Sequence, residues 1–307
     1  MGRRVIITGA PGWVGRVAMD VVRDAPGGNT PELILSARSD RLLLHGGTAV
    51  EVGRTSSLPD RELGADPLVI HAGFPTQDQV EVMGGGAYVA AITELRATML
   101  EVISRHGPLD LIYLSSGAAT SVERGVEVAE RTQVYGQAKL DDEAAYAEAM
   151  ARTGGRLCIV RAFALSGPYM TKPEAYALGS MIMQAEATGC IEVRATHPVR
   201  RSYMAIDDML RIAMHVVGEL DSGDSASFET AGEIVEMGEL ASRVLGVLGA
   251  NASAVRRPEF KPDAPPNDYL GDTHEMERLA SAAGVVLADL DRQIAVTADW
   301  LRVGGIA

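Results

Sequence analysis

One stretch of the chain combines residue types that can move a proton. Tyr135 and Lys139 lie four residues apart in YGQAK (135–139), so on a helix their side chains share one face. A phenol has an ordinary pKa of about 10 and is a weak base at neutral pH. A nearby ammonium group favours the phenolate and lowers that pKa. Tyr135 is therefore a candidate acid and base toward a substrate hydroxyl, with Lys139 as its partner.

Two serines, Ser115 and Ser116, end the apolar run LDLIYL (109–114) that precedes this helix. The run predicts a buried strand, and open α/β sheets bind ligands at the carboxyl ends of their strands. A serine hydroxyl at that edge can hydrogen-bond the same substrate oxygen as Tyr135. The three residue types together predict proton transfer to or from a substrate hydroxyl, and with the dinucleotide loop described next they point to nicotinamide-dependent oxidation or reduction at a carbinol carbon.

A glycine-rich loop, TGAPGWVG (8–15), joins the first apolar run to the first helical stretch. Gly9 permits a tight turn, Gly12 lets the backbone approach a pyrophosphate, and Gly15 lets the helix pack close to the strand. The N-terminus of the helix adds free N–H groups and a partial positive charge. We therefore expect a dinucleotide at Thr8, Gly9, Gly12, Trp13, Val14 and Gly15. A Tyr-x-x-x-Lys match alone is common by chance. Here it follows the glycine loop and the two serines in that order along the chain, and this combination is specific.

The end of the second predicted strand bears on the choice of cofactor. It reads Leu35-Ser36-Ala37-Arg38 and lacks the acid that would hold a ribose hydroxyl. An arginine at this place can hold a 2′-phosphate, so Arg38 favours NADP over NAD. The alternative is that Arg38 is only a solvated loop residue.

The elements that position these groups alternate between short apolar strands and helical stretches. Strands are predicted at 5–8, 33–35, 49–52, 68–71, 109–114 and 157–160, and helices at 14–23, 86–105 and 136–152. This alternation predicts βαβ units, hence an α/β fold with a Rossmann-type doubly wound parallel sheet.

The pattern becomes less regular after Gly167-Pro168, and residues 255–271 contain four prolines typical of a long loop. We therefore predict a NAD(P)-binding domain at 1–166 and a smaller, mainly substrate-binding lobe at 167–307. The chain is expected to return to the first domain around 203–230.

Composition narrows the class of partner. The net charge of −13 argues against nucleic acid, which requires a basic surface. No run of about 18 apolar residues predicts a membrane span. The two cysteines form no CxxC pair, and no Cys/His cluster has zinc spacing, so no metal site is predicted. Isolated cysteines fit a reducing compartment, and a cytoplasmic protein is expected.

The chain resembles the extended short-chain dehydrogenase/reductase family, in the branch of nucleotide-sugar epimerases and dehydratases. The matching segments are TGAPGWVG (8–15), VIHAGF (69–74), YLSSGA (113–118), YGQAK (135–139), RAFALSGP (161–168) and RRSYMAIDD (200–208). They span nearly the whole chain. The resemblance implies a Rossmann domain, a C-terminal substrate lobe and a homodimer.

The resemblance also assigns residues. It implies that Ser116 is the catalytic hydroxyl, Tyr135 the acid and base, and Lys139 its partner. The further residues implied at the cofactor are His71, Ala72, Gly73, Ser115 and Phe163, besides Tyr135 and Lys139. Those implied at the substrate are Phe74, Ser116, Gly117, Tyr135 and Arg201. Arg201 matches an arginine that often holds the diphosphate of a nucleotide sugar.

The chain departs from the family pattern at two places. Dehydratases that act on hexose carbons 4 and 6 usually carry an Asp-Glu pair after the catalytic hydroxyl, but this chain has Gly117 and Ala118, which cannot transfer protons. This argues against such a dehydratase. The segment that follows Phe74 also departs from the pattern, so a substrate other than a sugar stays open.

Three hypotheses follow. The first is a redox-neutral epimerase, in which a hydride is removed from a sugar carbon and returned to the opposite face of a keto intermediate. The second is an NADPH-dependent ketoreductase, which Arg38 favours. The third is an NADP-binding sensor without catalytic activity. The presence of both Tyr135 and Lys139 argues against this hypothesis.

Overall fold

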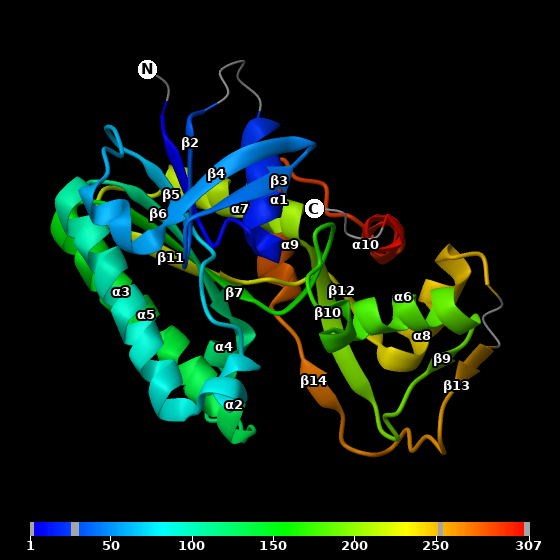
Figure 1. Ribbon diagram of the computed structural model, residues 1–307. Helices are drawn as coiled ribbons and strands as arrows, with labels where there is room; N and C mark the ends of the chain where they lie inside the picture. The colour runs from blue at the N-terminus through cyan, green and yellow to red at the C-terminus, as the bar shows by residue number, and fades with distance from the viewer. Residues whose placement is uncertain (1–2, 26–30, 251–253, 304–307) are drawn as a thin grey trace. The chain divides into compact units, whose positions relative to one another are not determined.

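A computed structural model describes residues 3–25, 31–250 and 254–303. Within these ranges eight strands form one large sheet in the order β11-β7-β6-β5-β1-β2-β4-β3 (Figure 1). They are β1 (Val5–Thr8), β2 (Leu33–Ala37), β3 (Arg41–His45), β4 (Thr48–Arg54), β5 (Leu68–His71), β6 (Asp110–Ser116), β7 (Arg156–Ala162) and β11 (Ser225–Glu229).

The strand order reverses at β1. From β1 the chain passes to β2 on one side and later to β5 on the other, and both pair with β1 in parallel. β6 and β7 extend the sheet in parallel beyond β5, while β3 pairs antiparallel with β4. Ligands of open α/β sheets bind at such a reversal, outside the carboxyl ends of the strands. The arrangement confirms the predicted doubly wound α/β class.

Helices flank this sheet. They are α1 (Trp13–Arg23), α2 (Gln79–Met83), α3 (Gly85–His106), α4 (Gly117–Glu123), α5 (Glu130–Thr153) and α7 (Ile206–Glu219), with a 3₁₀ turn η1 (Thr55–Asp60). α3 and α5 run side by side (Figure 1). Val102 of α3 and Met150 of α5 share one buried apolar cluster with Val69, Leu111 and Leu157 of the strands. The two long helices therefore cover one face of the sheet.

Three local features differ from the sequence prediction. The chain forms a hairpin of β3 and β4 where only a strand at 49–52 was expected. The exposed positions of β3 are occupied by Leu42 and Leu44, so the strand lacks the alternation of apolar and polar residues that would have predicted it. α5 begins at Glu130, so Tyr135 lies in its second turn and not at its start. Ser115 and Ser116 lie inside β6, which continues two residues beyond the apolar run.

The chain divides into two compact units. The first runs to Ala162 and includes Leu210–Phe228, and the second comprises residues 163–209 and 229–303. The second unit holds β8 (Ala164–Ser166), β9 (Ile191–Glu192), β10 (Val199–Ala205), β12 (Glu233–Glu236), β13 (Val255–Arg256) and β14 (Asn267–Tyr269). Its remaining elements are η2 (Pro173–Ala175), α6 (Ala177–Thr188), α8 (Met237–Val247), α9 (Thr273–Ala283) and α10 (Leu290–Arg302). None of the described helices has the length and apolar character that a bilayer crossing requires.

Candidate active site

The glycine loop lies at the point where the strand order reverses. Gly9 has a φ of 68°, and a Cβ added there would lie 2.5 Å from the Cα of Gly73, which follows β5. A Cβ on Gly15 would lie 2.3 Å from the carbonyl oxygen of Gly9. Both positions therefore need glycine, because backbone meets backbone there.

Gly12 has a different environment, since a Cβ there would meet only the carbonyl oxygen of Gly9, at 3.1 Å. Gly12 is also the N-cap of α1, which has no side-chain cap and no acidic residue in its first turn. Open space thus adjoins the positively polarised end of a helix. The loop fits the pyrophosphate of a dinucleotide on both steric and electrostatic grounds.

His71 connects the ends of β1 and β5. Its Nδ1 lies 2.6 Å from Oγ1 of Thr8, which also accepts the N–H of Gly73 at 3.1 Å. Burial, together with the charge of Lys139, lowers the pKa of His71 to about 3. The imidazole is therefore neutral at physiological pH and holds the two phosphate-side loops together. Its contact with a cofactor stays a prediction, as does that of Ala72.

Lys139 is buried beside β6, with an exposed fraction of 2%. Its Nζ donates a hydrogen bond to the carbonyl oxygen of Leu114 at 2.7 Å and lies 3.3 Å from the centroid of the Phe74 ring. Burial lowers the pKa of Lys139 to about 7, while Asp142 and Glu143 act in the opposite direction. A small change in these contacts therefore decides whether the amine is charged at neutral pH.

Tyr135 is half-buried beside this amine. Its ring centroid lies 5.8 Å from Nζ of Lys139 and 5.9 Å from the Phe74 ring, which meets it edge to face. The next residue, Gly136, packs against α4, and a Cβ there would lie 2.5 Å from the carbonyl oxygen of Ala118. Gly136 thus brings Tyr135 next to the junction of β6 and α4, where Ser116 lies.

The two serines have different partners. Ser115 donates to the carboxylate of Glu143, which also accepts from Nη2 of Arg161 at 2.7 Å. Ser116 is the N-cap of α4, and its Oγ accepts the N–H of Ala118 at 3.2 Å. The hydroxyl of Ser115 is therefore used within the fold, while Ser116 lies at the carboxyl end of β6, the edge at which such sheets bind ligands.

Two acids of α5 next to Lys139, Asp142 and Glu143, were not among the residues predicted from the sequence. Glu143 lies four residues after Lys139 and Asp142 three, so helical periodicity could have placed both on its face. Asp142 accepts from the hydroxyl of Tyr113 at 2.9 Å and pairs with Arg96 of α3. Burial raises the pKa of Asp142, and Arg96 opposes that rise. Arg96 does not lie in a recognisable motif, so its pairing with Asp142 could not have been predicted from the sequence.

Arg38 follows β2 as an exposed residue, and in the described part of the chain it makes no hydrogen bond or ion pair. The carboxylate in the same loop, Asp40, is bound by Nε of Arg54 at 2.8 Å. Arg38 is therefore a cation at the end of β2 that pairs with no acid among the described residues.

In the second unit, two residues predicted at the site, Phe163 and Arg201, both lie next to the ring of Tyr269. The Phe163 ring lies 4.5 Å from the Tyr269 ring, and the guanidinium of Arg201 lies 5.9 Å from that same ring. Arg201 donates to the carbonyl oxygen of Asn267 at 2.9 Å and forms no ion pair with any described residue. Burial lowers its pKa. The neighbouring Arg200, by contrast, pairs with Asp268.

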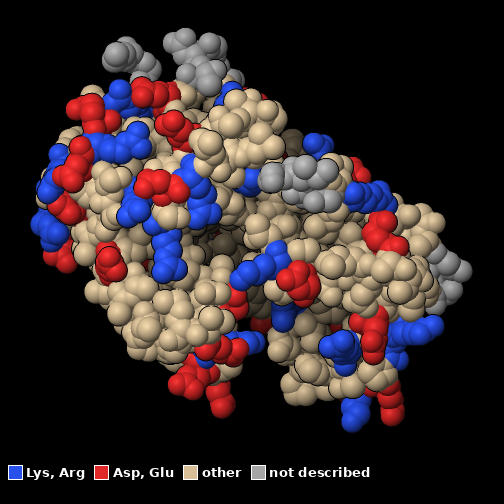
Figure 2. Space-filling model, viewed as in Figure 1, with Lys and Arg blue, Asp and Glu red and all other residues tan. Residues whose placement is uncertain are grey.

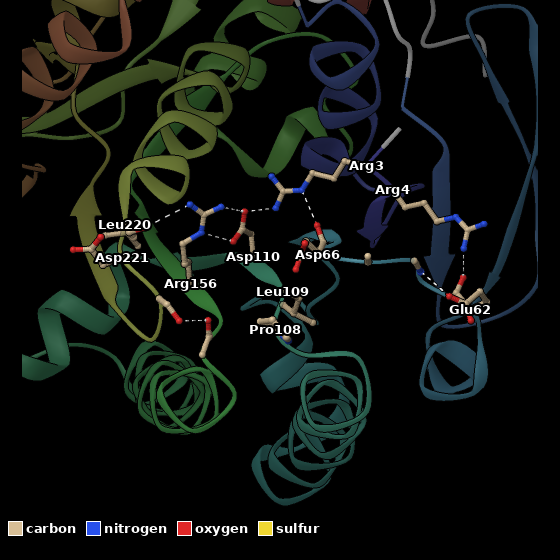
Figure 3. A pocket seen from close by; sticks show the side chains of 14 residues that line it. Arg3, Arg4, Glu62, Asp66, Pro108, Leu109, Asp110, Arg156, Leu220 and Asp221 are labelled. Carbon is tan, nitrogen blue, oxygen red and sulfur yellow. Dashed lines mark hydrogen bonds and ion pairs between the residues drawn. The ribbon is translucent and has the colours of Figure 1, made fainter. Parts of the chain in front are cut away.

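A cavity of about 1130 Å³ lies at the opposite edge of the large sheet, before the amino ends of its strands (Figure 3). Arg3 and Arg156 both bind the carboxylate of Asp110, at the start of β6. Nη1 of Arg156 also donates to the carbonyl oxygen of Gly218 at 2.8 Å. Because these charges compensate one another, we interpret the cluster as a structural tie between strands. Among the described residues no group of three or more His, Cys, Asp or Glu is placed to hold a metal ion.

Comparison with known proteins gives a family and a fold. Residues 5–238 match the model of the NAD dependent epimerase/dehydratase family. No curated protein sequence gives a significant match.

Solved structures similar to this chain include UDP-N-acetylglucosamine 4-epimerase from Methanobrevibacter ruminantium M1, with a TM-score of 0.76 and 13% identity over 99% of each chain. UDP-glucose 4-epimerase from Thermotoga maritima, in a complex with UDP-glucose, has a TM-score of 0.72 and 16% identity over 98% of this chain and 99% of its own. The dTDP-glucose 4,6-dehydratase of Streptomyces venezuelae with bound NAD has a TM-score of 0.71 and 19% identity over 98% of this chain and 97% of its own.

Proposed function

The chain belongs to the NAD dependent epimerase/dehydratase family, and on that premise we propose that it interconverts a carbinol and a ketone by reversible hydride transfer with a nicotinamide cofactor. The observation that carries the proposal is the grouping of Ser116, Tyr135 and Lys139. Lys139 is buried 5.8 Å from the Tyr135 ring, and Gly136 packs Tyr135 against the helix that Ser116 caps. These contacts support a site that combines an acid, a cation and a hydroxyl at the carboxyl end of β6.

The chain's own residues have distinct tasks in this reaction. Gly12 and the N-terminus of α1 bind the pyrophosphate of the dinucleotide, whose nicotinamide supplies the hydride acceptor and donor. Tyr135 as phenolate takes the proton of the substrate hydroxyl as the carbonyl forms, and returns it in the reverse step. Lys139 in its charged form stabilises that phenolate. Ser116 hydrogen-bonds the reacting oxygen.

We propose a nucleotide sugar as the substrate and epimerisation as the net reaction. Arg201 supports the first part, because it is a partly buried cation without an ion-pair partner among the described residues and so suits a diphosphate. Gly117 and Ala118 support the second, because they lack the acid and base that elimination of water requires. The 4-epimerases with similar folds act on UDP-sugars.

The second candidate is an NADPH-dependent ketoreductase, which one observation favours. Arg38 is exposed, lacks an acidic partner among the described residues, and lies where a 2′-phosphate would be bound. Such a reductase would use Ser116, Tyr135 and Lys139 once, in one direction.

Two measurements test these proposals. The Tyr135→Phe variant should lose turnover by about 10²–10⁴-fold while it still binds the cofactor, and unchanged turnover would defeat both candidates. Denaturing the purified protein and identifying any released nicotinamide separates them. A cofactor retained near one per chain supports the epimerase, whereas an empty site that prefers NADPH supports the reductase.

The proposed role of Arg201 has a matched control in Arg200. With UDP-glucose as the probe, Arg201→Ala should weaken binding by about 10–100-fold, because hydrogen bonds to charged groups contribute about 1.5–3 kcal/mol. Arg200→Ala should leave binding within about twofold, since Arg200 is engaged with Asp268. Calorimetric titration of both variants checks this, and equal losses would contradict a specific phosphate contact.

We also propose a cytoplasmic homodimer that does not bind nucleic acid. The free cysteines Cys158 and Cys190 suit a reducing compartment. On the face shown in Figure 2, basic and acidic side chains are interspersed, which does not suit a polyanion. Light scattering during size-exclusion chromatography tests the dimer.

A further inference from the structure

The Phe74 ring lies directly on the amine of Lys139. The distance from Nζ to the ring centroid is 3.3 Å, well within the range of about 6 Å over which a ring face attracts a cation. We propose that Phe74 is a positioning residue for Lys139, whose ring face seats the ammonium group and favours its charged form. The role in catalysis that follows rests on the proposed function, but the seating of the amine does not.

The ring is held in place by the loop that carries it. The carbonyl oxygen of Pro75 accepts the hydroxyl of Tyr88 at 2.8 Å, which ties the loop to α3. Nε2 of Gln77 donates to Oγ1 of Thr132 at 2.6 Å, which ties it to α5. Phe74 also packs against a buried cluster of Val80, Tyr88, Ile92 and Ala138. These contacts hold the loop that carries the ring against α3 and α5.

The ring also limits what else the amine can bind. An ammonium group has three N–H donors. One donates to the carbonyl oxygen of Leu114, and the ring face covers another direction. At most one N–H therefore remains for a cofactor hydroxyl or for the oxygen of Tyr135.

Charged and titratable groups beside Lys139 lie on α5, β6 and β5, and on α3, where Arg96 pairs with Asp142. On α5 they are Asp142, Glu143 and Tyr135, and the two carboxylates favour the charged amine. On β6 the Tyr113 ring centroid lies 4.8 Å from Nζ, and burial raises the pKa of Tyr113 so that it stays neutral. On β5, His71 is neutral because burial lowers its pKa to about 3.

These groups leave the amine close to balance at neutral pH. Burial lowers the pKa of Lys139 to about 7, against the attraction of the two carboxylates. The ring face attracts only the charged form, so its removal lowers the pKa further. A neutral Lys139 would no longer stabilise the phenolate of Tyr135.

The sequence allows the charge of Lys139 to be observed directly. The chain contains three lysines, and Lys172 and Lys261 are exposed whereas Lys139 is buried. Protein labelled with ¹³C at the lysine ε-carbon therefore gives three signals, and the signal missing from Lys139→Met identifies Lys139. Its chemical shift against pH gives the pKa in the folded chain, without substrate or cofactor.

The matched variants are Phe74→Leu, which keeps bulk but removes the ring face, and Phe74→Tyr, which keeps the face. We expect Phe74→Leu to lower the midpoint of Lys139 by about one pH unit, and Phe74→Tyr to restore it. The signals of Lys172 and Lys261 should titrate as in the wild type, and an unchanged circular dichroism spectrum shows that the fold is intact.

An unchanged midpoint in Phe74→Leu would overturn the proposal, whatever the activity of the variant. So would an equal fall in Phe74→Tyr, because loss of packing and not of the ring face would then be the cause. Failure of the proposed function is a separate result. It would appear as full turnover in Tyr135→Phe, and it would leave the seating of Lys139 by Phe74 standing.

Discussion

At the residue scale, the neighbouring serines of β6 illustrate how similar side chains differ in role. Ser115 satisfies a buried carboxylate, Glu143, together with Arg161, whereas Ser116 caps α4 at the edge where a ligand is expected. Ser115 therefore belongs to the support of the site, and Ser116 to the group proposed to contact substrate.

This difference gives a prediction with an internal comparison. Ser116→Ala should lower turnover by about 10²-fold, because it removes a donor to the reacting oxygen. Ser115→Ala should mainly lower the free energy of unfolding, by about 1–3 kcal/mol, because it takes a hydrogen bond from the buried Glu143. Steady-state kinetics and urea unfolding of both variants check this. The opposite pattern would show that the roles of the two serines are exchanged.

Arg38 carries the prediction on cofactor choice. Arg38→Ala should weaken NADPH binding by about 10–100-fold, since a charge-assisted phosphate contact contributes about 1.5–3 kcal/mol. NADH binding should stay unchanged, because NADH lacks the 2′-phosphate. Fluorescence titration measures both affinities. Arg41→Ala is the control, as Arg41 donates to Ser39 in the same loop. Equal effects of the two substitutions would mean that only the general positive charge matters.

At the scale of elements, the approach of α5 to α4 sets the position of Tyr135. A Cβ on Gly136 would lie 2.5 Å from a carbonyl oxygen of α4, so an added methyl must push the helices apart. Gly136→Ala should lower stability by about 1–3 kcal/mol and turnover by about 10-fold or more, because small displacements of catalytic groups are costly.

Gly86→Ala is the matched control in α3. Beyond the adjoining backbone of its own helix, no described atom lies within 4 Å of a Cβ at Gly86, so alanine should stabilise the helix by up to about 1 kcal/mol and leave turnover unchanged. Thermal unfolding and kinetics of both variants decide the point. If Gly136→Ala behaves like Gly86→Ala, the helix contact does not position Tyr135.

The sheet and the glycine loop could be predicted from the sequence because each depends on local chemistry. Apolar β-branched runs such as 5–8 form strands in many contexts, and a glycine loop between strand and helix has one common use. The hairpin of β3 and β4 was not predicted, because Leu42 and Leu44 are apolar yet exposed and so hide the alternation typical of a strand. They are exposed because β3 is the edge strand of the sheet, which the sequence does not show.

The support of the site was harder to predict for a related reason. Asp142 and Glu143 lie on the face of Lys139 and could have been found by helical spacing. Arg96 and Arg161 could not, since each reaches its acid from an element distant in sequence. Phe74 was expected at the substrate, and its contact with Lys139 depends on how the loop after β5 is tied to α3 and α5.

At the scale of the whole molecule, the buried His71 links stability to pH. The pKa of His71 is about 3 in the folded chain against 6.5 for an unperturbed histidine. Between these values the unfolded chain binds a proton that the folded chain does not, so the free energy of unfolding rises with pH. The stability due to neutral His71 is fully present above pH 6.5 and is lost progressively as the pH falls toward 3.

The His71→Asn variant isolates this effect, because its amide can still hydrogen-bond Thr8 but does not titrate in this range. Between pH 6.5 and 5 the wild type should lose about 1.6 kcal/mol more stability than the variant, because the slope grows from about 0.7 to about 1.4 kcal/mol per pH unit over this range. Urea unfolding at several pH values measures the difference, with His274→Asn on the exposed surface of α9 as the control. Parallel curves for the wild type and His71→Asn would mean that His71 takes up a proton in the folded chain, and that the contact between β1 and β5 tolerates a charged imidazole.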